Sequence, residues 1–120
     1  EQTRWLREAV QEESFRNARY RVVLVHIPPA ANGQGYGATR IRTSWSPILN
    51  HANIDLAFSG HTHRFARIDP NDLDHPYPIL VNAPDMAVHV EVSEDRLAVT
   101  VKRTDGSIVD TLFVKPRSVE

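Results

Sequence analysis

The sequence contains no cysteine and no long apolar run. Without cysteine there is no disulfide framework and no thiolate metal site, so any bound metal must take nitrogen and oxygen ligands. No apolar run approaches the roughly 20 residues needed to span a bilayer. An excess of either charge is missing too, because 14 Lys and Arg balance 15 Asp and Glu to a net charge of −1. We therefore expect no nucleic-acid or membrane binding.

Carboxylates are scarce in the first half of the chain. No aspartate precedes Asp55, and the acidic residues ahead of His26 are four glutamates of one expected helix: Glu1, Glu8, Glu12 and Glu13. The chain also starts without Met, so we expect the natural N-terminus to lie upstream. Otherwise the composition, with 41% hydrophobic and 24% charged residues over 120 positions, is that of one globular domain or part of one.

Glycine is limited to five residues, of which Gly33, Gly35 and Gly37 lie close together around Tyr36. This composition predicts a mobile loop over residues 30–39. The spacing matches neither a G-x-G-x-x-G nucleotide motif nor a P-loop, which also needs a lysine. A substrate lid and a simple linker both remain open for this loop.

The first half of the chain predicts alternating helices and strands. Apolar residues at helical spacing indicate an amphipathic helix that ends before Tyr20. Residues 21–26 and 54–58 are short apolar runs typical of interior strands covered on both faces. Between them, Ser46 and Pro47 predict a helix start, with Ser46 as N-cap, and Asn53 its end. This order makes a parallel crossover, whose ligands normally lie beyond the carboxyl ends of the strands.

After His63 the pattern predicts strands only. Alternating apolar residues, such as Val88 and Val90 or Leu97 and Val99, indicate strands with one dry and one wetter face. Asp105-Gly106 is a strong hairpin signal. The expected strands cover residues 65–68, 79–81, 86–92, 97–101 and 108–114.

Three histidines follow the two interior strands. His26 ends the first run, and His61 and His63 follow the second after Gly60, which can turn sharply or lie close to a ligand. Imidazole binds divalent transition metals through one ring nitrogen, so these residues indicate one metal site. The alternative is that they are structural residues at strand ends. For the other three we expect structural or surface roles: a helix C-terminus for His51, a surface loop for His75 and a solvated strand face for His89.

These residues carry a family resemblance. Val23-Leu24-Val25-His26 with Pro28, residues 54–63 ending in Gly60-His61-Thr62-His63, and the opening Gln2-x-x-Trp5-Leu6 together resemble the C-terminal half of a calcineurin-like metallophosphoesterase, the superfamily that includes purple acid phosphatases. The resemblance covers about residues 2–64. It implies an α/β sandwich of mixed sheets with helices outside and a β-rich C-terminal tail.

The resemblance also implies a two-metal centre of Fe, Mn or Zn that hydrolyses phosphate monoesters or diesters. His26 and His61 would bind one metal, and His63 the other. Two cations about 3.5–4 Å apart polarise phosphoryl oxygens and generate a hydroxide near neutral pH. The family's Asp-x-His, Gly-Asp and Gly-Asn-His motifs cannot be placed in this sequence.

We therefore interpret residues 1–120 as a single partial catalytic domain, with an α/β portion at 1–64 and a β-rich portion at 65–120. Its expected partners are a phosphoester substrate, through the parent enzyme, and the missing N-terminal half. Neutral imidazoles alone do not offset the charge of two divalent cations. We expect weak metal binding or none, negligible hydrolysis by the chain alone, and self-association through exposed sheet edges.

Two other interpretations stay open. The chain could be a non-enzymatic β-rich interaction module, or a mononuclear Zn²⁺ site in which His26, His61 and His63 share one ion. Tyr36 and Arg64 are weak candidates for phosphate contact. No residue is identified as a nucleophile or general base.

Overall fold

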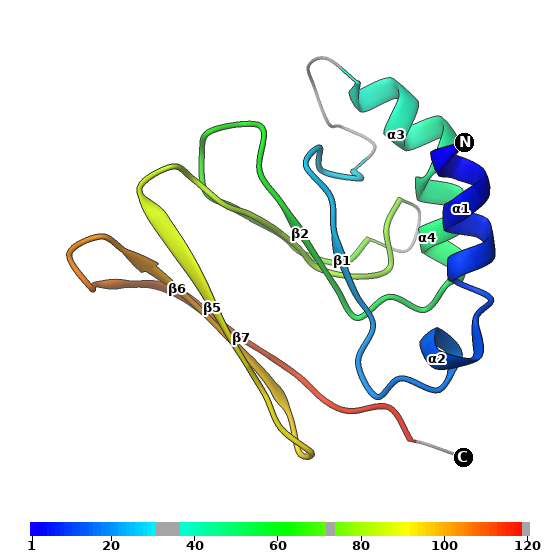
Figure 1. Ribbon diagram of the computed structural model, residues 1–120. Coiled ribbons are helices and arrows are strands. Elements are labelled where there is room, and N and C mark those ends of the chain that lie inside the picture. Colours follow the sequence, from blue (N-terminus) through cyan, green and yellow to red (C-terminus); the bar gives the residue numbers. More distant parts are fainter. Residues whose placement is uncertain (31–36, 72–73, 119–120) are drawn as a thin grey trace.

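The computed structural model describes residues 1–30, 37–71 and 74–118. Figure 1 shows three layers, in which helices lie on one side of a first sheet and a second sheet lies on its other side. The mixed α/β architecture with two sheets confirms the fold class predicted from the sequence. No helix in the described ranges is long and apolar enough to cross a membrane.

The first sheet has four strands in the order β1-β2-β4-β3. β1 (Val22–Leu24), β2 (Leu56–Ser59) and β4 (Ile79–Val81) run parallel, and β3 (Ala66–Ile68) pairs antiparallel with β4. The expected parallel crossover between the first two strands is confirmed. β3 and β4 join this sheet, so the residues after 64 are shared between the two sheets.

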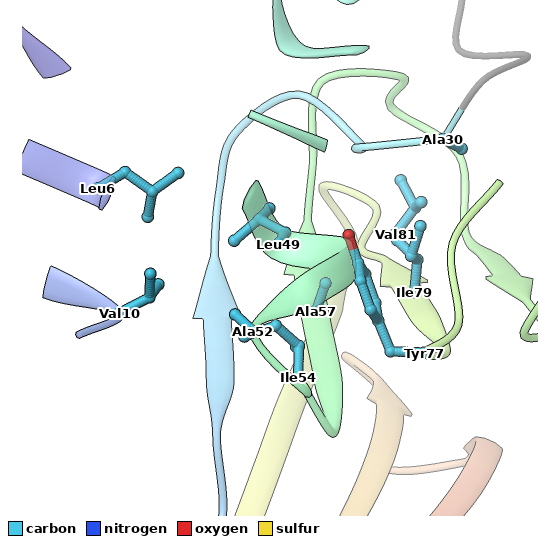
Figure 2. Close-up of a cluster of buried hydrophobic side chains, with 10 residues drawn as sticks. All are labelled: Leu6, Val10, Ala30, Leu49, Ala52, Ile54, Ala57, Tyr77, Ile79 and Val81. Carbon is cyan, nitrogen blue, oxygen red and sulfur yellow. The ribbon is translucent and has the colours of Figure 1, made fainter. Parts of the chain in front are cut away.

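In the described ranges four helices accompany this sheet: α1 (Gln2–Ala9), α2 (Glu13–Arg16), α3 (Ala38–Ser44) and α4 (Ser46–His51). Residues that alternate along the central strands supply the sheet side of the core, and α1 and α4 supply its helical side. Figure 2 shows this helix-side cluster, which consists of Leu6, Val10, Ala30, Leu49, Ala52, Ile54, Ala57, Tyr77, Ile79 and Val81.

The second sheet is an antiparallel meander of β5 (Met86–Val92), β6 (Leu97–Arg103) and β7 (Ile108–Val114). Alternate residues of β6 are buried against the opposite faces of β2 and β4, as the sequence alternation predicts. The predicted hairpin is confirmed at Gly106, whose φ of 86° needs a residue without Cβ. This second cluster comprises Leu56, Leu80, Leu97, Val99 and Val101.

A polar clasp centred on Asp55 joins the C-terminal segment to the first sheet. Arg117 Nη2 lies 2.7 Å from Asp55 Oδ1, and the Arg21 backbone N–H donates to Asp55 Oδ2 at 2.8 Å. The Arg21 side chain in turn donates to the Ala52 and Arg16 carbonyls. Burial, followed by the nearby Arg117 charge, lowers the pKa of Arg21. The clasp therefore connects segments before β1, before β2 and after β7.

Several local expectations were wrong. β1 is an edge strand, and Val22 and Leu24 are 38% and 78% exposed, because an apolar run indicates a buried environment without supplying the neighbour that covers it. The segment before Tyr20, expected to form one helix, contains two, because α1 ends at Ala9 and the separate α2 follows. α3 begins within the expected glycine loop, at Ala38 and Thr39, and continues over residues for which no element was predicted. Residues 31–36 of that loop lie outside the described ranges.

Two polar residues also differ from their expected roles. Ser46 does not cap α4, because its hydroxyl is buried and donates to the Pro29 carbonyl at 3.3 Å. His75 is 2% exposed instead of lying on the surface, and its Nδ1 lies 2.9 Å from the Tyr77 carbonyl. The positions of His51, exposed at the end of α4, and His89, exposed on β5, agree with expectation.

Candidate metal centre

The candidate centre lies where β1 and β2 end side by side. Their pairing continues past the strands, because Val25 N–H donates to the Phe58 carbonyl and Gly60 N–H donates to the His26 carbonyl, both at 3.0 Å. These two hydrogen bonds fix the backbone at the carboxyl edge of the sheet. His26 and His61 are thereby placed next to each other, as the strand-end positions predicted.

The turn after β2 has an unusual backbone. His61 and His63 both have positive φ angles, 70° and 58°, although neither is glycine. Thr62 N–H donates to the Gly60 carbonyl at 2.8 Å, and the Thr62 hydroxyl donates to the Arg64 carbonyl at 3.1 Å. Left-handed backbone at non-glycine residues costs free energy and concentrates at functional sites. The backbone of this turn therefore adopts an unfavourable conformation at both of its histidines.

Two ring nitrogens converge at this edge. His61 Nδ1 lies 3.3 Å from His26 Nε2, and the two rings are nearly perpendicular, with an interplanar angle of 83°. Two nitrogens that bind one tetrahedral ion at 2.0–2.1 Å are about 3.3 Å apart. The same separation permits a direct hydrogen bond when one nitrogen is protonated. The separation of the His26 and His61 nitrogens is therefore compatible with a shared cation and with a direct hydrogen bond.

His63 does not join this pair. Among the described residues, no group of three or more His, Asp or Glu side chains is placed to hold one ion. The mononuclear interpretation, which needs all three histidines on one Zn²⁺, is therefore not assembled in this structure. In the two-metal pattern His63 belongs to a different ion, and each ion needs further ligands.

The neighbours of the histidines play smaller parts than expected. Gly60 does not adopt a positive φ, and a Cβ placed on it would meet His26 Nδ1 at 3.8 Å, which is ordinary contact. The sharp turn thus falls on His61, not on the glycine. Arg64 is exposed and contacts Thr62 within the turn, and Tyr36 lies outside the described residues.

One polar residue at this edge was not anticipated. Asn82 follows β4, the third parallel strand, and its N–H donates to the Ser59 carbonyl at 2.8 Å. The Asn82 Oδ1 and Ser59 Oγ atoms are buried without a hydrogen-bond partner in the described part of the chain. The signal in the sequence was the position of Asn82 directly after an apolar run, as for His26.

Comparison with known families agrees with this arrangement. The sequence profile of the calcineurin-like phosphoesterase family matches residues 1–65, which include the helix α1, the parallel strands β1 and β2 and the three histidines. The chain belongs to this family. Phosphoester hydrolysis with divalent metals is characteristic of the family.

Two individual proteins are similar to larger parts of the chain. A probable purple acid phosphatase 20 from Arabidopsis thaliana is 26% identical over 92 residues, which are 71% of this chain and 22% of that protein. The solved structure of GAP50, described as the anchor in the inner membrane complex of Plasmodium, aligns with 98% of this chain and 42% of its own, with a TM-score of 0.71 and 15% identity. The second likeness confirms the fold. The chain spans less than half the length of either protein.

Proposed function

We propose that the chain supplies part of the ligand set of a two-metal phosphoesterase centre. His26 and His61 would hold one cation, and His63 would hold the second. The observation that carries the proposal is the 3.3 Å separation of the His26 and His61 nitrogens at the carboxyl edge of the parallel strands. The family's chemistry supports the reaction class, which is hydrolysis of phosphate monoesters or diesters. When bound, the cations would polarise the phosphoryl group and provide the hydroxide.

The remaining ligands would come from outside these 120 residues. Within the described ranges no carboxylate lies with the histidines in a group able to hold an ion. Divalent cations in such centres need anionic ligands to offset their charge. The protein's share is therefore to fix two imidazoles at one cation, through the ladder bonds of Gly60 and Val25, and a third on the strained turn. We propose that the chain alone binds metal weakly and does not turn over substrate.

Isothermal titration with Zn²⁺ and Mn²⁺ tests the ligand assignment. We expect weak binding by the chain, reduced at least about tenfold in His26→Ala and His61→Ala because two-nitrogen chelation is lost. His89→Ala is the matched control, since it removes an exposed histidine from the second sheet and should leave binding unchanged. Equal affinity in the wild-type chain and in His61→Ala contradicts the site.

A chromogenic phosphomonoester assay with added Mn²⁺, Zn²⁺ or Fe tests the proposal that the chain alone does not hydrolyse substrate. We expect no hydrolysis above the metal-only background. Robust turnover that disappears in His61→Ala would show that the chain is active alone and would overturn the proposed dependence on outside ligands, while retaining the histidine site.

The rival function is a non-enzymatic β-rich interaction module, which the exposed valines of β5 favour. It is distinguished by its indifference to metal. Thermal stability unchanged by saturating Zn²⁺ and Mn²⁺, together with no measurable heat of binding, would favour the module.

A further inference from the structure

The turn that carries His61 and His63 is built around the residue between them, Thr62. The Thr62 N–H donates to the Gly60 carbonyl at 2.8 Å. The Thr62 hydroxyl donates to the Arg64 carbonyl at 3.1 Å and accepts from the Arg64 N–H at 3.4 Å. All three bonds join residues within one stretch of five. They do not require any part of the domain outside this stretch.

The backbone of Thr62 accounts for the conformation of His61. A hydrogen bond from the N–H of one residue to the carbonyl two residues earlier closes a γ-turn, and a central φ of about +75° marks its rare and strained form. His61 is the central residue of such a turn, with a φ of 70°. Because a backbone N–H closes the turn, any residue except proline can do so at position 62.

The side chain of Thr62 has the same relation to His63. A threonine hydroxyl that accepts from the N–H two residues later closes a local turn around the residue between them. That residue is His63, whose φ is 58°. Within the described ranges the Arg64 backbone makes no hydrogen bond other than those to the Thr62 hydroxyl. A left-handed histidine, which costs free energy, is thus held by one hydroxyl.

The two histidines of the turn therefore have different supports. His61 is half-buried, and its Nδ1 lies 3.3 Å from His26 Nε2, so its ring also contacts the end of the neighbouring strand. Thr62, His63 and Arg64 are exposed. Burial consequently contributes little to the conformation of His63, and the hydroxyl of Thr62 contributes much of it.

We propose that Thr62 is a positioning residue for the second cation. Its hydroxyl holds the His63 backbone in the left-handed conformation, and this conformation sets the direction in which the imidazole leaves the turn, since side-chain direction is coupled to the backbone angles. The inference rests on the proposed function, in which His63 binds a cation separate from that of His26 and His61. Loss of the hydroxyl should therefore act on the second cation and spare the first.

Valine and serine separate the hydroxyl of Thr62 from the rest of its side chain. Thr62→Val keeps the branched shape and removes the hydroxyl, whereas Thr62→Ser keeps the hydroxyl and removes the methyl group. Neither variant changes the backbone N–H that closes the turn at His61. Thr104→Val is the matched control, because Thr104 is also exposed and its hydroxyl has no hydrogen-bond partner among the described residues.

Nuclear magnetic resonance of the metal-free chain tests the effect on conformation. A residue with positive φ gives a strong Overhauser effect between its own amide and α protons, because the two protons lie close together. We expect this signal at His61 and His63, and in Thr62→Val it should fall at least about twofold at His63 alone, as loss of one exposed hydrogen bond implies. Thr62→Ser and Thr104→Val should keep both signals. An unchanged His63 signal in Thr62→Val overturns the proposal.

Titration with Zn²⁺, followed through the ring signals of the histidines, tests the link to metal. We expect His26 and His61 to respond together and His63 to respond separately, at higher Zn²⁺ concentration. Thr62→Val should weaken the His63 response about threefold or more and leave the other two unchanged, since only the backbone of His63 depends on the hydroxyl. Thr62→Ser should behave like the wild-type chain.

The possible failures of this titration have different meanings. A Thr62→Val variant that weakens all three rings equally, or none of them, contradicts the role of Thr62. A response of His26 and His61 without any response of His63 in the wild-type chain contradicts it as well. No response of any of the three rings contradicts the proposed metal centre itself, and the inference with it. Neither measurement depends on phosphoesterase activity.

Discussion

The two sheets of this molecule differ in burial and in the sequence separation of their contacts. β2 and β4 are buried on both faces, between helices on one side and the second sheet on the other, and their side chains are almost entirely apolar. In the second sheet only one face of β6 is buried, and both outer strands are partly exposed. The first sheet depends on contacts between distant segments, whereas the second depends on two hairpins.

The two sheets therefore differ in their roles: the candidate metal ligands belong to the first sheet, and the second sheet is a set of local hairpins. The candidate metal ligands lie at the carboxyl edge of the first sheet, where the backbone includes two strained histidines. The second sheet covers one face of the first sheet. Substitutions in the two sheets should therefore differ in size and in kind.

The largest difference in stability should come from replacing an isoleucine by alanine in each of the two sheets. Ile79→Ala removes a 0% exposed side chain from β4 and should lower the free energy of unfolding by about 3–4 kcal/mol, because it leaves a cavity in the helix-side cluster. Ile108→Ala, at a 60% exposed position on β7, should cost less than about 1 kcal/mol. Urea unfolding followed by circular dichroism measures both. Similar losses at the two sites would contradict the contrast in burial.

A smaller contrast concerns the glycines. Gly106→Ala should cost about 1–2 kcal/mol, because alanine at a φ of 86° is strained although the space beside it is open. Gly60→Ala should be close to neutral for stability, since its φ is not positive and the new Cβ meets only ordinary contacts. Thermal unfolding of both variants provides the comparison. A larger loss at Gly60 would mean that the histidine turn depends on the glycine.

The smallest effect should be a gain. The Tyr77 hydroxyl is buried in the helix-side cluster without a hydrogen-bond partner in the described ranges, so Tyr77→Phe should stabilise the chain by about 1 kcal/mol. The matched variant Tyr20→Phe should not stabilise, because the Tyr20 hydroxyl donates to the Ser93 carbonyl at 3.0 Å. Chemical denaturation near pH 7 separates the two. A gain in Tyr20→Phe or a loss in Tyr77→Phe would contradict this assignment.

The same residue predicts a pH dependence. Burial, with the nearby Asp74 charge, raises the pKa of Tyr77 above its ordinary value near 10. The unfolded chain therefore loses this proton first, and the associated stability is complete below about pH 10 and declines as the pH rises further. Tyr77→Phe should remove that part of the decline. Identical alkaline profiles for the wild-type chain and the variant would contradict it.

The sequence predicted what local patterns can encode. Strands were predicted where the structure has them from the apolar runs at residues 54–58 and 79–81 and from the alternation in residues 97–101. Strand ends also gave the positions of His26 and His61, because parallel strands bring their carboxyl ends to one edge. The family profile confirmed the class of protein, and the similar solved structure confirmed the fold.

Other features depended on tertiary contacts. α3 was missed because its residues, Ala38–Ser44, are mostly polar and follow a glycine-rich stretch. The burial of His75 depends on its bond to the Tyr77 carbonyl. The edge position of β1 was missed because an apolar run does not reveal which strand lies beside it. The positive φ angles of His61 and His63 have no sequence signal of their own.

The clasp at Asp55 has a consequence for the order of folding. Its donors Arg21 and Arg117 are separated from Asp55 by 34 and 62 residues, so the clasp forms only after a long loop has been closed. Loop closure costs chain entropy before such a contact can contribute. Contacts that form after the folding transition state slow unfolding without accelerating folding. We therefore expect the clasp to slow unfolding of the folded chain and to change its folding rate little.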